Sequence, residues 1–197
     1  MRPLDPRTTR SRHAALLSAR ELLIEQGLPG LTHVAVAARS GISRATLYRL
    51  WPEPTDLVRA AVARHIALAQ STPTGDLRAD LLTELAGIRM MLHERASEQG
   101  LRVMIERAGV DARFAEVKAA LYRSGTSVVR TILADAVARA ELPPELDLDV
   151  AIDRLLGPMF FRRLIANQTF DLDYAHDVVD DFLREYTTKS RHQQGNC

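Results

Sequence analysis

Cysteine is nearly absent from this sequence, with the single Cys197 at its last position. One thiol can form neither an intrachain disulfide nor a multi-thiolate metal site, which favours a reducing cytoplasm as the location. Long apolar runs are absent too, and no stretch approaches the roughly 20 residues that a membrane-spanning helix needs. The first residues, Met1-Arg2-Pro3-Leu4-Asp5, lack the apolar segment of a signal peptide. We therefore expect neither membrane insertion nor secretion.

Catalytic and cofactor-binding motifs are missing as well. The sequence has no phosphate-binding glycine loop and no nucleophile elbow, and His93-Glu94 lacks the second histidine of a zinc-protease helix. Three carboxylates and an imidazole share one face of the last expected helix, at three-and-four spacing: Asp173, His176, Asp177 and Asp180. Such a set can bind a divalent metal, but it is more often a solvated acidic face. We predict no cofactor, no metal and no enzymatic activity.

The composition is that of a globular protein, with 46% apolar and 26% charged residues in a chain of 197. This length suits one large or two small domains. The formal net charge of +1 is unevenly spread, because the first 52 residues hold eight arginines and no lysine against three acidic residues, about +5. The remainder is then about −4. A basic N-terminal part on a mildly acidic body favours binding to phosphate through one end.

Apolar residues recur at helical spacing along the whole chain, and no convincing period-two run or internal repeat interrupts them. Gly27, Gly75, Gly109 and Pro143-Pro144 mark breaks between helices, and Pro158 should kink the helix that contains it. The fold is therefore predicted as all-α, with about nine helices at 10–26, 32–40, 43–50, 54–70, 76–99, 101–108, 111–140, 147–166 and 171–187.

Residues 32–51 predict a helix-turn-helix, in which two short helices flank Ser-Gly-Ile-Ser. Gly41 lies where the chain must reverse with a positive φ, which glycine adopts without strain. Ser43 is placed to cap the second helix by accepting a hydrogen bond from the N–H near Ala45 or Thr46. The inward residues are apolar or small: Val36, Ala37, Ile42, Leu47 and Leu50. The second helix is then shaped to enter a DNA major groove.

The outward side of this motif supplies the candidate DNA-binding residues. Arg44 is the candidate base reader because a guanidinium can bind guanine in a bidentate manner, although an arginine that contacts only phosphate remains an alternative. Thr32 and His33 open the first helix of the motif, where free N–H groups can receive a phosphate; Thr32 can equally be a simple N-cap. The complete set also contains two arginines before or within the first helix: Arg10, Arg12, Thr32, His33, Ser43, Arg44, Thr46, Tyr48 and Arg49.

These residues resemble the tetracycline-repressor (TetR) family of bacterial transcription regulators over roughly residues 10–70. The resemblance implies a three-helix DNA-binding domain at 1–53, which a fourth helix links to a ligand-binding and dimerisation domain at 54–197. It also implies a homodimeric repressor that a small apolar ligand releases from an inverted-repeat operator. The matching residues are Gly27, Leu31-Thr32, Val36-Ala37, Gly41-Ile42-Ser43, Thr46-Leu47-Tyr48-Arg49 and Trp51-Pro52, with Gly157–Arg162 resembling a later helix.

Within this resemblance, Tyr48 matches a tyrosine that hydrogen-bonds a DNA phosphate, although it can also be a half-buried aromatic packed on its own helix. Two positions depart from the family pattern. Pro54 stands where members usually carry a lysine that reaches a phosphate, and Val34 stands where the tetracycline repressor has a base-reading arginine. Neither of those two contacts is carried over to this chain.

The resemblance also implies an apolar ligand cavity in the body, although each candidate can equally be an ordinary core residue. The candidates are Met90, Met91, Met104, Ile105, Phe114, Tyr122, Met159, Phe160 and Phe161, with Arg89, His93 and Arg162 as polar residues that orient a ligand. The last two helices carry apolar stripes that one chain has no obvious way to bury, so they are the predicted dimer interface: Ile152, Leu155, Leu156, Met159, Val178, Val179, Phe182 and Leu183.

Two other functions remain open from the sequence. One is a non-inducible DNA-binding protein whose body serves only dimerisation. The other is an enzyme with an accessory DNA-binding domain, which the lack of an acid–base or metal constellation disfavours.

Overall fold

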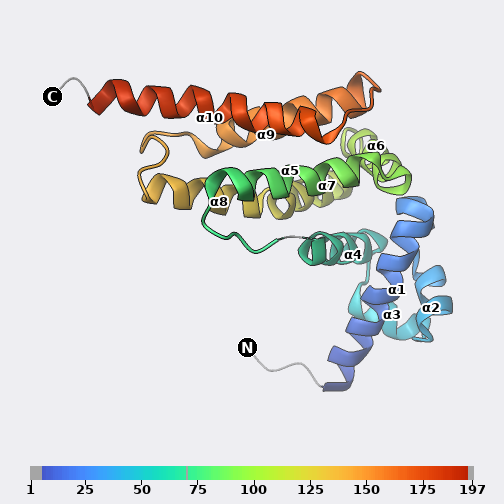
Figure 1. Ribbon diagram of the computed structural model, residues 1–197. Coiled ribbons are helices and arrows are strands. Elements are labelled where there is room, and N and C mark those ends of the chain that lie inside the picture. Colours follow the sequence, from blue (N-terminus) through green and yellow to red (C-terminus); the bar gives the residue numbers. More distant parts are fainter. Residues whose placement is uncertain (1–5, 70, 195–197) are drawn as a thin grey trace. The chain divides into compact units, whose positions relative to one another are not determined.

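The computed structural model describes residues 6–69 and 71–194 (Figure 1). These residues form ten α-helices and one short π-helix, and the described ranges contain no strand. The prediction of an all-α fold is confirmed. The chain divides into two compact units. Unit 1 comprises the chain up to Leu68 together with Glu94–Ser124, and unit 2 comprises Ala69–His93 together with the chain from Gly125 onward.

Unit 1 contains the expected helix-turn-helix and two later helices that join its core. The first helix of the chain packs against both the helix-turn-helix and the first of these later helices. The buried apolar core includes Leu22, Val36, Leu47, Leu57 and Met104. The helices of unit 1 are α1 (Pro6–Gly30), α2 (His33–Ser40), α3 (Arg44–Leu50), α4 (Pro54–Ala69), α6 (Arg95–Ala108) and α7 (Ala112–Gly125).

Two glycines in unit 1 have the positive φ that favours glycine. Gly27 interrupts α1 with φ 69°, so the expected end of the regular helix lies at this residue. Gly41 has φ 71° in the left-handed region and ends α2, with its N–H donating to the carbonyl of Ala37. A Cβ at Gly41 would meet no neighbouring atom, so backbone conformation alone favours glycine there.

Unit 2 is a second helical bundle. Its helices are α5 (Leu77–His93), α8 (Ser127–Ala138), α9 (Leu148–Phe160), the π-helix η1 (Phe161–Ile165) and α10 (Leu172–Gln194). Figure 1 shows α9 and α10 side by side over α5 and α8, in agreement with the packing of α5 against α8, α9 and α10. The α-helix that contains Pro158 gives way at Phe161 to the π-helix.

Two expected helix boundaries are wrong. The helix expected at 76–99 ends at His93 because Glu94 has an extended backbone and begins α6, where Ser97 donates a hydrogen bond to its carboxylate. Gly100, the residue after the expected end of that helix, is a buried residue inside α6. The helix expected at 111–140 is interrupted at the buried Thr126, which separates α7 from α8.

Two carboxylates on α5 hold the segment that precedes this helix. Asp80 accepts hydrogen bonds from the N–H groups of Thr74 and Gly75 and from the Thr74 hydroxyl, and Glu84 accepts from Ser71. Burial of Asp80 by itself would raise its pKa, but the hydrogen bonds to the carboxylate outweigh burial and lower the pKa from its usual value. Ser71, Thr74 and Gly75, which precede α5, are therefore bound to this helix through the two carboxylates.

Candidate nucleic-acid interface

The helix-turn-helix is held by the caps and the apolar anchor expected from its sequence. The Ser43 side chain accepts a hydrogen bond from the Thr46 N–H at 3.2 Å, which confirms the predicted N-cap. Leu47 is completely buried, and the Trp51 N–H donates to its carbonyl at the end of α3. At the start of α2, Thr32 accepts from the Ala35 N–H at 3.1 Å. Thr32 therefore acts as an N-cap.

The exposed surface of α3 is positively charged. Arg44 and Arg49 are exposed, and neither forms an ion pair with another residue in the described part of the chain. Tyr48 is 49% exposed, Ser43 is exposed, and Thr46 is half-buried with its hydroxyl 2.9 Å from that of Ser43. Five of the predicted residues thus lie on one short helix and its cap, with two guanidinium groups available for phosphate or a base edge.

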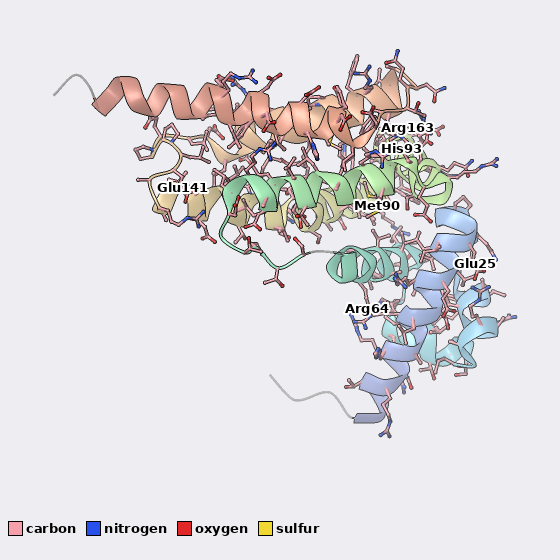
Figure 2. The ribbon with its side chains drawn as sticks, viewed as in Figure 1. Glu25, Arg64, Met90, His93, Glu141 and Arg163 are labelled. Atoms are coloured by element: carbon pink, nitrogen blue, oxygen red, sulfur yellow. The ribbon has the colours of Figure 1, made fainter. Side chains whose placement is uncertain are left out.

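An ion pair joins α1 to α2 in the same unit. Glu25, labelled on α1 in Figure 2, accepts from the Arg39 guanidinium at 2.7 Å. This hydrogen bond lowers the pKa of Glu25 and raises that of Arg39. Both groups are at the surface, where such pairs stabilise a fold only slightly. Arg39 is thereby neutralised, in contrast to Arg44 and Arg49.

His33 does not have the exposure expected of a DNA contact. Its side chain is only 3% exposed, and its Nε2 lies 2.8 Å from the carbonyl oxygen of Trp51. The imidazole also stacks on the Tyr48 ring, with centroids 4.3 Å apart and an interplanar angle of 14°. The His33 ring is therefore not available for a phosphate contact, because folding places it between α2 and the C-terminal end of α3; a contact through the His33 backbone N–H stays a prediction.

Arg10 and Arg12 are both exposed on α1. The Arg12 guanidinium lies over the Trp51 ring, 5.2 Å from its centroid, a distance at which a cation–π interaction is attractive. Trp51 itself is buried, whereas the sequence indicates only that a helix ends there. Trp51 contacts Arg12 of α1 and His33 of α2. Sequence spacing does not predict these contacts, because they join residues of different helices.

The predicted ligand-binding residues of unit 2 differ in their surroundings. Met159 is completely buried in the core, and Met90 is largely exposed. His93 donates from Nδ1 to the carbonyl of Arg89 and accepts the Phe170 N–H at Nε2, while the Arg89 guanidinium donates to the Phe170 carbonyl. Arg89 and His93 thus fasten the segment before α10 to α5. Figure 2 shows His93 and Met90 on this helix.

The other candidates of unit 2 are also engaged locally or placed at the surface. Arg162 lies over the Tyr174 ring at 4.5 Å from its centroid, and Phe160 is half-buried. The neighbouring Arg163, also labelled in Figure 2, donates to the carbonyl of Leu92 at the end of α5. The arginines that follow α9 therefore contribute to packing within the unit.

In unit 1, Met104 is buried in the core, Phe114 is half-buried, and Ile105 and Tyr122 are exposed. A cavity between α4 and α7 has a volume of about 10 Å³, which is room for a single water molecule. None of the predicted ligand residues lines it; its walls are Arg59, Ala63, Val117, Ala120 and Leu121. The predicted ligand residues are thus distributed over the two units.

The predicted dimer residues are mostly buried within the single chain. Those on α9 face the interior of unit 2, and on α10 the buried members are Val179 and Phe182. Val178 and Leu183 are half-buried. The assumption that one chain cannot cover both stripes is wrong, because α5 and α8 supply the apolar partners. The corrected set of buried residues is Ile152, Leu155, Leu156, Met159, Val179 and Phe182.

The outward side of α9 and η1 carries a different apolar stripe. Val150, Phe161 and Ile165 are 44%, 62% and 72% exposed. Gly157 lies between them along the helix, also exposed, and a Cβ at this position would meet no atom within 4 Å. We call these four residues the α9 outer stripe. Large apolar side chains exposed along one helix are a common mark of an interface.

The acidic residues at the start of α10 do not form a metal site in the described ranges, where no group of three or more histidine, cysteine, aspartate or glutamate side chains is arranged to hold an ion. Asp180 instead forms a bidentate ion pair with Arg78 of α5, at 2.7 and 2.9 Å. This pair lowers the pKa of Asp180. Among the described helices, none has the length and apolarity needed to cross a membrane.

Comparison with known families and proteins agrees with this geometry. Residues 15–61 match the family model described as bacterial regulatory proteins, tetR family. Residues 71–182 match the model described as tetracyclin repressor-like, C-terminal domain. Together these matches extend over the helix-turn-helix and most of the remaining helices.

Individual relatives match over nearly the full chain. An uncharacterized helix-turn-helix transcriptional regulator of Mycobacterium tuberculosis is 33% identical, covering 96% of this chain and 94% of that protein. A DNA-binding transcriptional repressor TetR of Mycobacteroides abscessus is 29% identical, covering 88% and 92%. The crystal structure of the TetR family transcription regulator SCO0332 superposes with a TM-score of 0.79 at 28% identity, covering 89% of this chain and 97% of that one.

Proposed function

Since this chain belongs to the tetR family of bacterial regulatory proteins, we propose that it is a homodimeric repressor that a small apolar molecule releases from an inverted-repeat operator. It is a helix-turn-helix transcriptional regulator, and regulators of this family bind DNA and act as dimers. Residues 1–53 would contact DNA in the cytoplasm, and residues 54–197 would dimerise and bind the effector.

The observation that carries the proposal is the outward side of α3. Arg44 and Arg49 lack an acidic partner among the described residues, and Tyr48 is half exposed beside them, while Leu47 anchors the helix from below. A short helix that presents guanidinium and hydroxyl groups fits the width of the DNA major groove. Because a two-fold dimer carries two such helices, its operator should contain two copies of one half-site in inverted orientation.

Selection from a pool of random duplexes tests this function and identifies the operator sequence in the same experiment. The full-length protein is expected to enrich an inverted repeat whose half-site centres lie about 10 base pairs, or a multiple of that, apart along one face of the helix. Binding to the enriched duplex should weaken steeply with salt, since phosphate contacts release counterions. Enrichment of no sequence, or of a site without two-fold symmetry, would contradict the proposed mode of binding.

The dimer contact is placed on an apolar surface that the single chain leaves uncovered. The apolar stripes first predicted for dimerisation are used inside unit 2, whereas the α9 outer stripe of Val150, Gly157, Phe161 and Ile165 is exposed. Gly157 allows a close approach of a second helix, since it has no side chain to hold the backbones apart. The two-fold contact then runs along α9 and η1, continued by the exposed Leu172 at the start of α10.

The effector is expected to act through differential affinity for two states of the dimer. An apolar molecule that binds among the helices of residues 76–140 should weaken operator binding by a factor equivalent to about 1–3 kcal/mol. By thermodynamic reciprocity, the selected duplex must weaken binding of that molecule by the same factor. The measurement is a pair of titrations, of duplex with and without the molecule and of the molecule with and without duplex. A molecule that binds the C-terminal domain tightly yet leaves duplex affinity unchanged would favour a non-inducible regulator.

A further inference from the structure

The C-terminal end of α3 is hydrogen-bonded to a buried histidine. His33, the first residue of α2, lies 2.8 Å from the carbonyl oxygen of Trp51, which follows the last residue of α3. A carbonyl oxygen can only accept, so His33 Nε2 carries a hydrogen and donates it. The last carbonyl groups of a helix have no partner within the helix. His33 supplies one for α3 and thereby ties the end of α3 to the beginning of α2.

The same imidazole also stacks on the Tyr48 ring. The two rings are nearly parallel, with 14° between their planes and 4.3 Å between their centroids, while 49% of Tyr48 remains exposed. A tyrosine on an exposed helix surface would otherwise sample several rotamers. Fixing such a side chain before binding removes an entropic cost of about 0.5–1.5 kcal/mol from the binding step. The stack therefore affects how Tyr48 is presented to a ligand on this surface.

Trp51 extends this arrangement to α1. Its buried ring lies beneath the Arg12 guanidinium at 5.2 Å, and its carbonyl is the acceptor for His33. One residue at the end of α3 thus contacts side chains from both α1 and α2. Displacing the Trp51 backbone would move Arg12 and release Tyr48 together.

We infer that His33 is a positioning residue for DNA binding, which holds Tyr48 by ring stacking, while its hydrogen bond to the Trp51 carbonyl stabilises the fold of the helix-turn-helix. The inference rests on the proposed function, because it concerns the surface assigned there to DNA. The imidazole acts through Tyr48 and does not itself reach DNA, since His33 is only 3% exposed. The two contacts of the imidazole are separable by substitution, which allows the positioning role to be distinguished from a general contribution to folding.

The test uses two variants of the full-length protein, each of which keeps one contact. His33→Phe keeps a flat ring against Tyr48 but has no donor for the Trp51 carbonyl. His33→Gln keeps an N–H donor but cannot stack. Affinity is measured for the selected duplex and for a random duplex, and thermal unfolding is followed by the fluorescence of Trp51, which is the only tryptophan in the sequence. His176→Gln, the same chemical change in unit 2, is the matched control.

We expect the two variants to rank in opposite orders by unfolding temperature and by affinity for duplex DNA. His33→Phe should unfold at a lower temperature than His33→Gln, because it leaves a buried carbonyl without a partner. His33→Gln should nevertheless bind both duplexes about three- to tenfold more weakly than the unsubstituted protein, since Tyr48 must then be ordered during binding. His33→Phe should bind within about twofold of the unsubstituted protein, because it retains a ring that holds Tyr48. His176→Gln should change neither affinity.

A double substitution provides the decisive comparison. In a Tyr48→Ala background, His33→Gln should weaken duplex binding no further, because there is no ring left to hold. Additive losses of affinity, or equal losses in His33→Phe and His33→Gln, would overturn the inference. Those outcomes leave the proposed function intact as long as the unsubstituted protein binds the selected duplex. Failure of the unsubstituted protein to bind any duplex would instead remove the proposed function.

Discussion

Gly157→Arg is expected to convert the proposed dimer into a folded monomer. Gly157 lies on the exposed side of α9, and a Cβ there would meet nothing within 4 Å, so the single chain can accommodate the longer side chain. Arginine also favours a helix interior over glycine by roughly 0.5–1 kcal/mol. In a two-fold contact along the α9 outer stripe, by contrast, two guanidinium groups would be buried opposite each other without partners.

The expected size of this effect is large. Burying an unpaired charge costs several kcal/mol, so the dimer dissociation constant should rise by at least about a hundredfold. Light scattering and sedimentation across a concentration series measure the dissociation constant, and circular dichroism reports whether the helices are retained. Gly87→Arg is the matched control, since a Cβ at Gly87 of α5 also meets nothing within 4 Å. A Gly157→Arg protein that remains fully dimeric would show that α9 does not form the two-fold contact.

Arg44→Ala is expected to lower affinity for the selected duplex by about 1–3 kcal/mol for each half-site, which is about 5- to 150-fold. The side chain is exposed at the first position of α3, where it has no acidic partner among the described residues. If Arg44 reads a guanine, the loss should be concentrated on the selected sequence, and repeated selection with the variant should yield a degenerate base at one position of each half-site.

The control for this variant must remove the same charge elsewhere. Arg123→Ala on α7 does so, because Arg123 is exposed and lies outside the helix-turn-helix. Both variants should unfold at nearly the same temperature as the unsubstituted protein, since surface substitutions of this kind change stability by less than about 0.5 kcal/mol. An equal loss on selected and random duplexes would make Arg44 a phosphate contact. Unchanged affinity on both would remove Arg44 from the interface.

Much of the helix-turn-helix was predictable because its constraints are local. The positive φ at Gly41 and the N-cap at Ser43 depend on residues within four positions along the chain, and the structure confirms both. The inward position of Leu47 follows from helical periodicity, which places Arg49 on the other side; Arg44 is exposed because it is the first residue of α3. Five candidate DNA-binding residues, from Ser43 to Arg49, therefore needed no tertiary information.

Other features of the site required contacts between helices. His33 is polar and adjacent to an exposed N-cap, which in the sequence indicates an accessible side chain, yet Trp51 and Tyr48 enclose it. Arg89 and His93 are polar residues that a ligand could reach, but the Phe170 backbone supplies partners for both. In each case the partner lies 15 or more residues away along the chain. Local spacing contains no information about such a distant neighbour.

The sequence by itself determined the all-α class, the helix-turn-helix, its caps and the charged face of its second helix. Tertiary structure decided which apolar stripes are covered inside one chain: Leu155 and Val179 are buried in unit 2, whereas Phe161 and Ile165 stay exposed. The physical reason is that apolar periodicity marks the face of a helix that avoids water. Whether that face is covered by the same chain or by a second copy depends on which other helices fold against it.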